Sequence, residues 1–508
     1  MLYMSVHLDV DVAWLLQCLE RFLSGGTYTD DLYETNPPLS FLIYLPAYPL
    51  FTTLGLSAKF SILVLFLLYV FLSNAILFKL LHKTQISSTT IIIICCATLT
   101  SQTWGAGMFF GLKDHLILSF LTPFILLQYL ISTADDKVSH GIAISTSIMG
   151  GIALCLKPHY AIIPAVLYAH RLITTKSLKK CLISIDTITL ILCGLSYFIF
   201  MYIFTPEYLV TMLPENSRLY RVETPFPIGL NLKVFAITIV ASFIGFALVI
   251  SANNEEQQEI KRIVLIFSGL SALCIIPYVI QNKGFLYHTT PLFGFGVAAL
   301  TMAAYGTCRL LTKKRTSALF LTLVFMAVIT HTFTRPMSSS VMNNKQFKAQ
   351  PIAEYIDENA WNKVYITFDM RSMLSPLPYL LDVKSGSRFG PIGHLYALSI
   401  LSSRTQNEEE QNKIKQDMMR FVDMMAEDMK KNKPSVIAIP LYPTDQKTNE
   451  PSDMYFKFLM ANENFAKAMQ NYTLDKRIPF NKSLKTGDNN NENIVWHDMY
   501  ILDKNNNL

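Results

Sequence analysis

Charged residues are scarce in this sequence. Only 16% of its 508 residues are Asp, Glu, Lys or Arg, whereas soluble domains carry about 25%. This shortage excludes an ordinary water-soluble protein for most of the chain. A dense basic cluster is also missing and the net charge is only +6, so the composition argues against a nucleic-acid-binding protein.

Cysteine is missing from the C-terminal part of the chain, because no cysteine follows Cys308. That part therefore has no internal disulfide. The sequence contains no Cys-x-x-Cys pair and no His-rich tract, so it does not predict a zinc site. Most of the eight cysteines fall in apolar segments, where a thiol behaves as a small hydrophobic group.

Long apolar runs, in contrast, fill residues 40–334. A helix of about 20 apolar residues crosses the hydrocarbon core of a bilayer. The sequence therefore predicts a polytopic α-helical membrane protein with about 10–11 transmembrane helices. We expect residues 39–56, which Pro46 and Pro49 interrupt, to form a helix at the outer membrane surface. The predicted spans are 59–81, 90–112, 116–131, 141–157, 160–171, 182–204, 232–252, 263–281, 291–311 and 316–334.

The remaining C-terminal residues, 335–508, have the composition of a soluble α/β domain. Apolar runs at 363–368 and 435–440 predict strands, and 494–502 predicts a closing strand. Helical periodicity covers 409–431 and 452–470, and the Asn-rich stretch 485–493 predicts a loop. The chain thus divides into a first extracytoplasmic loop (1–58), a helical bundle (59–334) and an extracytoplasmic domain (335–508).

Lysine and arginine predict the orientation of the bundle, because cytoplasmic loops are enriched in these residues. Basic residues occur in alternate loops, at 82–83, 135–137, 171–180, 261–262 and 313–315. The other loops then face outward, together with the C-terminal domain. This parity also places Met1 outside, so we expect a further membrane helix upstream of Met1; a translocated short N-terminal tail is the alternative.

Acidic side chains gather near the start of the chain, where Asp9 and Asp11 lie two residues apart. Either carboxylate could act as a general base on an acceptor hydroxyl. The alternative is an N-terminal helix cap, for which Asp is a favoured residue.

A second acidic group precedes the turn Asn36-Pro37-Pro38-Leu39. The prolines restrict the backbone on both sides of this turn. The group consists of Asp30, Asp31 and Glu34, and its members are either substrate-binding residues or parts of a polar surface turn.

Three further outward loops carry cationic or hydrogen-bonding side chains. Lysine is a compact positive charge that suits a phosphate group, and we expect these side chains to share a cavity with Asp11. The alternative is that the long side chains extend to the membrane interface. The residues are Lys113, Asp114 and His115, then Lys157 and His159, and finally Lys283, Tyr287 and His288.

The order of these motifs resembles the GT-C superfamily of integral-membrane glycosyltransferases. That superfamily includes the bacterial relatives of protein O-mannosyltransferases and the lipid A aminoarabinose transferase. The resemblance covers most of the chain, although the first membrane helix is missing and one extra residue lies between Tyr28 and Glu34. It rests on Asp11-Val-Ala-Trp14, Glu20-Arg21, Gly25-Gly26, Tyr28, Asp30, Glu34, Asn36-Pro37-Pro38-Leu39, Gly111-Leu-Lys113-Asp114-His115, Leu156-Lys157-Pro158-His159-Tyr160, Lys283–Pro291 and Ser387-Arg388-Phe389.

The resemblance implies an enzyme of a bacterial inner membrane that moves a sugar from a polyprenyl-phosphate carrier to an acceptor hydroxyl, usually with inversion. It implies that Asp11 is the general base, with Asp9 as the second choice. Asp114 would shape the donor or acceptor site, and Lys283 and His288 would contact the phosphate. Arg388 belongs to a further short motif of the family. Some relatives use a divalent metal, which this sequence does not require.

Rival functions are a transporter or lipid flippase, an O-antigen polymerase with a diphosphate donor, and a non-enzymatic envelope protein. A transporter would place charged residues at mid-membrane, often in broken helices. The polar residues here collect instead in loops predicted to lie on one side. The acceptor, which could be a glycan, a lipid or a protein, and the sugar cannot be read from the sequence.

Overall fold

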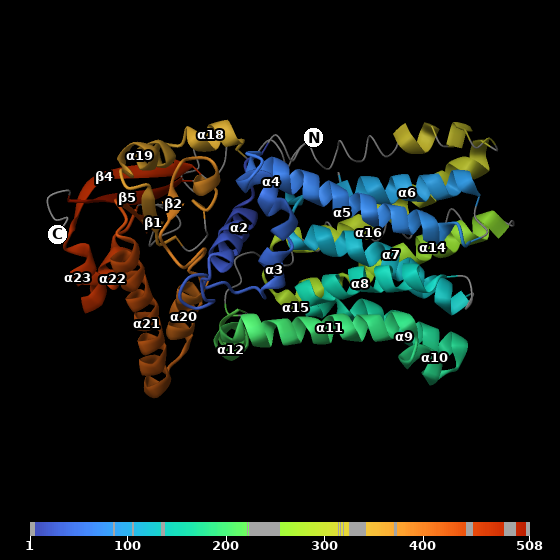
Figure 1. Ribbon diagram of the computed structural model, residues 1–508, viewed down its shortest axis with the longest axis horizontal. Helices are drawn as coiled ribbons and strands as arrows, with labels where there is room; N and C mark the ends of the chain where they lie inside the picture. Colours follow the sequence, from blue (N-terminus) through green and yellow to red (C-terminus); the bar gives the residue numbers. More distant parts are fainter. Residues whose placement is uncertain are drawn as a thin grey trace.

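The computed structural model places a long helical bundle beside a smaller domain that contains a β-sheet (Figure 1). Within the described residues, five segments are long and apolar enough to cross a membrane, and three shorter apolar helices accompany them. The protein is therefore an integral membrane protein. The structure describes residues 6–84, 87–103, 106–133, 138–220, 222, 255–312, 314, 316–318, 320–324, 342–369, 373–442, 451–481 and 494–503.

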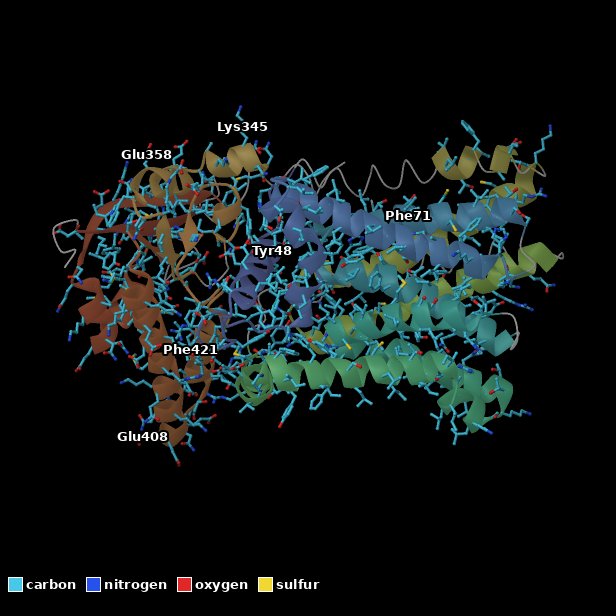
Figure 2. The ribbon with its side chains drawn as sticks, viewed as in Figure 1. Tyr48, Phe71, Lys345, Glu358, Glu408 and Phe421 are labelled. Carbon is cyan, nitrogen blue, oxygen red and sulfur yellow. The ribbon has the colours of Figure 1, made fainter. Side chains whose placement is uncertain are left out.

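The helices of the bundle run side by side along its length (Figure 1). Their apolar side chains pack inward and also face outward, as on Phe71, which is 65% exposed on α5 (Figure 2). Exposed apolar surface of this kind fits a lipid environment. The bundle is built from α5 (Ala58–Leu81), α6 (Ser88–Thr103), α7 (Lys113–Thr133), α8 (His140–Leu156), α9 (Ile162–Thr175), α10 (Leu178–Leu182), α11 (Ile185–Phe204), α14 (Glu255–Leu273), α15 (Ile275–Gln281) and α16 (Thr290–Thr312).

Several of the predicted helical segments are shorter or more broken than expected. Within the described residues, α6 accounts for the first part of the predicted span 90–112, up to Thr103, and a 3-10 turn at Gly107–Phe109 takes the place of its last part. Gly107 and Gly111 adopt positive φ angles, which glycine tolerates at no steric cost. The predicted surface helix 39–56 divides into α3 (Leu39–Leu42), a 3-10 turn at Leu45–Ala47 and α4 (Tyr48–Thr52). The predicted span 232–252, the second half of 316–334 and the predicted loop 485–493 lie outside the described residues.

The sheet of the C-terminal domain has the strand order β2-β1-β3-β5-β4. Strands β1 (Val364–Thr367), β2 (Lys384–Ser385) and β3 (Val436–Leu441) are parallel, whereas β5 (Ile494–Leu502) runs antiparallel to β3 and β4. The predicted strands therefore exist. Strand β4 (Tyr472–Asn481) was not predicted from the sequence, because five of its ten residues in succession are exposed and its apolar alternation is short.

Strand β3 is fully buried, and its two faces pack against different helices. Val436 and Ala438 join a small core with α19 (Pro351–Asn359), whereas Ile437 and Ile439 join the large core that includes α21 (Glu408–Asn432). The predicted helix 452–470 is two helices, α22 (Met454–Met460) and α23 (Glu463–Met469). Asn462 begins the second one, because its side chain accepts a hydrogen bond from the Phe465 amide.

Helix α2 (Val10–Leu23) lies between the bundle and the sheet domain (Figure 1). Its residues from Val12 to Leu19 are buried. The side chains of its second half bind the C-terminal domain: Gln17 donates to the Ser375 carbonyl at 2.9 Å, and Glu20 accepts from the Tyr379 hydroxyl at 3.1 Å. The first turn of α2 faces the bundle instead, and it is there that the candidate site is found.

Candidate active site

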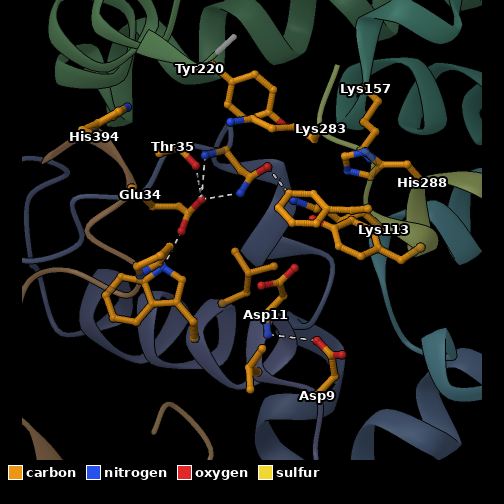
Figure 3. Close-up of a pocket in the computed structure, with 18 of the residues that line it drawn as sticks. Asp9, Asp11, Glu34, Thr35, Lys113, Lys157, Tyr220, Lys283, His288 and His394 are labelled. Atoms are coloured by element: carbon orange, nitrogen blue, oxygen red, sulfur yellow. Dashed lines mark hydrogen bonds between the residues drawn. The ribbon is translucent and has the colours of Figure 1, made fainter. Parts of the chain in front are cut away.

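A cavity of about 380 Å³ lies where the bundle meets the C-terminal domain. Its wall combines acidic, cationic and aromatic side chains from segments far apart in the sequence (Figure 3). Several of the residues predicted from the sequence are among them. The cavity is lined by Asp9, Val10, Asp11, Trp14, Leu15, Glu34, Thr35, Asn36, Lys113, Lys157, Leu219, Tyr220, Lys283, Phe285, Tyr287, His288, Pro391, Gly393 and His394.

Asp9 and Asp11 have different surroundings, although both line the cavity. Asp9 is the N-cap of α2, and its Oδ1 accepts hydrogen bonds from the amides of Asp11 at 2.9 Å and Val12 at 3.3 Å. Asp caps helices well because its side chain satisfies amides that the helix leaves unpaired. Asp11 lies in the first helical turn, where the helix dipole stabilises negative charge. The capping alternative therefore holds for Asp9, and Asp11 presents its carboxylate to the cavity (Figure 3).

The protonation of both carboxyl groups is shifted by their environment. Burial and the neighbouring Asp11 charge raise the pKa of Asp9 to about 7. Burial also raises the pKa of Asp11, although Lys113, the Tyr287 hydroxyl and Lys157 oppose that shift. A carboxylate with a raised pKa is a stronger base than an ordinary surface carboxylate, and catalytic groups are commonly tuned in this way.

Lys157 stands at the cavity wall and is held there by a buried ion pair. Its Nζ donates to both carboxylate oxygens of Asp114 at 2.7 Å and to Gln281 Oε1 at 3.0 Å. Asp114 itself is fully buried and does not line the cavity. Asp114 thus acts on the cavity through the ammonium group of Lys157.

Glu34 organises the turn that follows it. It is only 3% exposed and accepts hydrogen bonds from Trp14 Nε1 and from the Asn36 amide and side chain. The Asn36 side-chain oxygen in turn accepts from Lys113 Nζ. A buried carboxylate with this many donors is satisfied and fixes its partners, so Glu34 links α2 to the lysine at the start of α7.

The segment between α15 and α16 supplies the opposite wall. The ammonium group of Lys283 lies 4.3 Å from the centre of the Tyr220 ring, a cation–π distance. Tyr287 faces the Asp11 carboxylate. His288 is 2% exposed, and its Nδ1 has no hydrogen-bond partner within the described part of the chain. An unpartnered buried nitrogen beside a cavity is suited to meet a bound ligand.

Other predicted site residues lie away from the cavity. His115 stacks on Phe66, with ring centres 5.5 Å apart. His159, Asp30 and Asp31 do not line it either, and Asp31 pairs with Lys431 at 2.6 Å.

Arg388 is also absent from the cavity wall. Its guanidinium group donates to Asp428 at 2.7 Å and to Glu427 at 3.0 Å, both on α21. Arg388 therefore anchors the loop that precedes α20 (Gly393–Arg404).

Sequence reasoning missed the contribution of this loop to the cavity, namely Pro391, Gly393 and His394. His394 Nε2 forms a hydrogen bond with Asn216 Oδ1 at 2.8 Å, and burial lowers the pKa of His394 to about 4. A signal was present, because this Gly- and Pro-rich stretch directly follows the Ser-Arg-Phe motif. Tyr220 was missed as well, and no pattern in the sequence singles it out.

The arrangement suits the transfer of a group from a phosphate carrier. The Asp11 carboxylate faces a cavity whose wall also includes Lys113, Lys157 and Lys283, while Asp9 is used as a helix cap and Glu34 is bound by Trp14 and Asn36. Such cations stabilise negative charge that develops on a departing phosphate. Within the described residues, no group of three or more His, Cys, Asp or Glu side chains is arranged to hold a metal ion.

Comparison with known proteins gives a fold. No family model matches the sequence, and no curated protein matches it. Two crystal structures of ArnT from Cupriavidus metallidurans are similar in structure. The one bound to undecaprenyl phosphate has a TM-score of 0.54 at 12% identity and covers 98% of this chain and 95% of that chain. The apo structure has a TM-score of 0.43 at 12% identity, with coverages of 97% and 94%. The chain therefore has the fold of ArnT, as its motifs predicted.

Proposed function

We propose that this protein is a glycosyltransferase that moves a sugar from a polyprenyl-phosphate carrier to an acceptor hydroxyl. We further propose that it inverts the anomeric centre and that Asp11 is the general base. The observation that carries the proposal is the cavity itself, where the Asp11 carboxylate faces three lysine ammonium groups at the end of a membrane bundle. The GT-C fold supports it, and ArnT was crystallised with undecaprenyl phosphate.

The charges of the cavity suit the two halves of this reaction. The carrier's phosphate would lie near Lys157, Lys283 and His288, where the unpartnered His288 nitrogen offers one more contact. The acceptor hydroxyl would lie next to Asp11, which removes its proton as the oxygen attacks the anomeric carbon. The bond from that carbon to the phosphate oxygen breaks, and the lysines stabilise the charge on the released phosphate.

The position of the cavity suits a lipid-linked donor. It lies at the end of the bundle that meets the C-terminal domain, so a prenyl chain can stay in the membrane while its phosphate reaches the lysines. We propose that this end is extracytoplasmic in a bacterial inner membrane, with residues 335–508 outside. Cysteine-accessibility labelling of residues in α21 and α10 tests this orientation, because the two helices should react from opposite sides of the membrane.

The transfer assay uses the purified full-length chain with donors that differ in the phosphate. Sugars on undecaprenyl monophosphate, sugars on undecaprenyl diphosphate and no donor are compared, with a lipid extract of the host as the acceptor source. Transfer from the monophosphate donor supports the proposal. Transfer from the diphosphate donor alone would favour a polymerase. Transbilayer movement of the lipid without sugar transfer would favour a flippase. A lipid and glycan profile of a deletion strain then identifies the sugar and the acceptor.

A further inference from the structure

Trp14, on the cavity-facing side of α2, is held from three directions. Its indole Nε1 donates to Glu34, and the Arg21 guanidinium lies 5.3 Å from the ring centre. The backbone of Gly390, from the C-terminal domain, lies against the ring so closely that an added Cβ would come within 2.5 Å of the ring carbon Cδ2. Real Cβ atoms essentially never approach other atoms this closely, so glycine is needed at position 390 for steric reasons.

From Trp14 a chain of hydrogen bonds leads into the cavity. Glu34 accepts from Trp14 and from both nitrogens of Asn36, and Asn36 accepts from Lys113. Glu34 and Lys113 are at most 5% exposed, so these bonds lie largely out of contact with solvent. A buried network of this kind has one arrangement of its members, and a shift of one member is felt by the next.

The other side of the contact is also fixed. Arg21 donates to the carbonyls of Ser387 at 2.6 Å and Ser385 at 2.9 Å, which ties the loop before Gly390 to α2. Arg388 ties the same loop to Asp428 of α21 at 2.7 Å. Gly390 therefore has little freedom to move away from Trp14 when a side chain is added at position 390.

We propose that Gly390 and Trp14 are positioning residues, through which the docked C-terminal domain sets the place of the Lys113 ammonium group in the cavity. The loop of residues 385–394 presses on the indole ring, the ring orients Glu34, and Glu34 orients Asn36 and thereby Lys113. The consequence for activity rests on the proposed function, whereas the consequence for Lys113 does not. The C-terminal domain is on this view a part of the active site and not an appended binding module.

The test compares Gly390→Ala with the wild-type chain, both full length and purified in detergent. The first measurement is the labelling of Lys113 by an amine-reactive reagent, read by mass spectrometry relative to Lys157, which is held by Asp114 and lies outside the chain of bonds. We expect Gly390→Ala to raise the Lys113-to-Lys157 labelling ratio several-fold. The second measurement is transfer, which we expect to fall about tenfold in kcat/KM. Gly194→Ala is the matched control and should change neither quantity, because nothing lies within 4 Å of an added Cβ there.

Trp14→Phe provides a second route if Gly390→Ala does not fold. It removes the indole donor to Glu34, so it should raise the same labelling ratio. Combined with Gly390→Ala in a double variant, it should add little, because both changes act on one chain of contacts. Unchanged Lys113 labelling in both single variants, or fully additive effects in the double variant, would overturn the positioning role. A raised labelling ratio in the variants, together with no sugar transfer by the wild-type chain, would keep the positioning role and refute the proposed function instead.

Discussion

Two buried ion pairs lie at opposite ends of the same bundle, and they differ in what surrounds them. At the cavity end, Asp114 binds Lys157, with Gln281 beside it. At the other end, Asp186 accepts from Arg171 at 2.9 Å and from Gln128 at 2.9 Å. Helix α7 carries both Asp114 and Gln128, about 21 Å apart at 1.5 Å per residue. The chemistry of the two clusters is nearly the same: a carboxylate, a cation and a glutamine.

The difference lies in what the cation touches. Lys157 is part of the cavity wall, whereas neither Arg171 nor Asp186 lines the cavity. Arg171 suits a closed pair, since its planar guanidinium group remains charged when buried. Lysine responds more to its surroundings, and burial lowers the pKa of Lys157 to about 8 even with Asp114 beside it. A buried pair is thus not by itself a sign of function, and its contact with a cavity is what separates the two.

The largest effect on transfer is expected at the carboxylate that faces the lysines. Asp11→Asn removes the proposed base while it keeps the size of the side chain. General bases contribute about 10²–10⁴-fold to rates, so we expect kcat to fall by that amount. Thermal unfolding in detergent should be unchanged or slightly improved, because a buried charge is lost. Wild-type transfer by this variant would end the assignment of Asp11.

Asp114→Asn should reduce both transfer and stability. Removal of one partner from a buried ion pair costs about 3–5 kcal/mol, and Lys157 loses the charge that favours its protonated form. We expect kcat/KM for the lipid donor to fall, by less than the ~10²–10³-fold that complete removal of such an electrostatic contact costs. The alkaline limb of the pH–rate profile should also move to lower pH, because Lys157 without the Asp114 charge has a lower pKa and loses its proton at a lower pH. A stability loss with unchanged kinetics would mean that Lys157 does not serve the reaction.

The effect of Asp9→Asn is expected in the pH dependence. Asn is also a good N-cap, so the helix should begin as before, while the negative neighbour of Asp11 is lost. Because burial raises the pKa of Asp11, transfer should be lost, as the pH falls, above the usual carboxylate range near pH 4. Removal of a like charge lowers that pKa, so the acidic limb of kcat/KM should move to lower pH. An unmoved limb would indicate that Asp9 carries no charge in the active form.

Asp186→Asn should have the smallest effect on transfer. It breaks the pair with Arg171, so the midpoint of thermal unfolding should fall, as it does for Asp114→Asn. The kcat of the folded fraction should stay at the wild-type value, because this cluster does not line the cavity. A loss of kcat as large as that of Asp114→Asn would remove the distinction between the two ends of the bundle.

Much of the fold could be predicted from the sequence, because hydrophobic length and periodicity are local properties of the chain. Helices α5, α7, α8, α11 and α16 lie within a few residues of the predicted spans. Breaks were less predictable. The 3-10 turn at Gly107–Phe109 and the division of 452–470 accompany a glycine with a positive φ angle and a helix cap at Asn462. An average of hydrophobicity over many residues does not detect such features.

The candidate site was predicted in part. The segments that carry Asp11, Lys113, Lys157 and Lys283 do meet at one cavity. Asp9 and Asp11 could be told apart only once the first residue of α2 was known, because the N-cap is the residue that directly precedes the helix. The roles of His115 and Arg388 could be identified only from the residues they pack against, because a polar side chain in a sequence motif can hold a loop in place as well as bind a substrate.

The sequence by itself determined that the chain is a membrane protein, since burial of apolar helices in lipid depends on composition over about 20 residues. It also determined that the polar residues of interest lie in a few loops. The tertiary structure alone decided which of those residues share a cavity. Gly390 and Trp14 lie in contact although hundreds of residues separate them, and no local pattern encodes such a meeting. Contacts of this kind depend on how the helices and the sheet domain dock, and so on the whole folded chain.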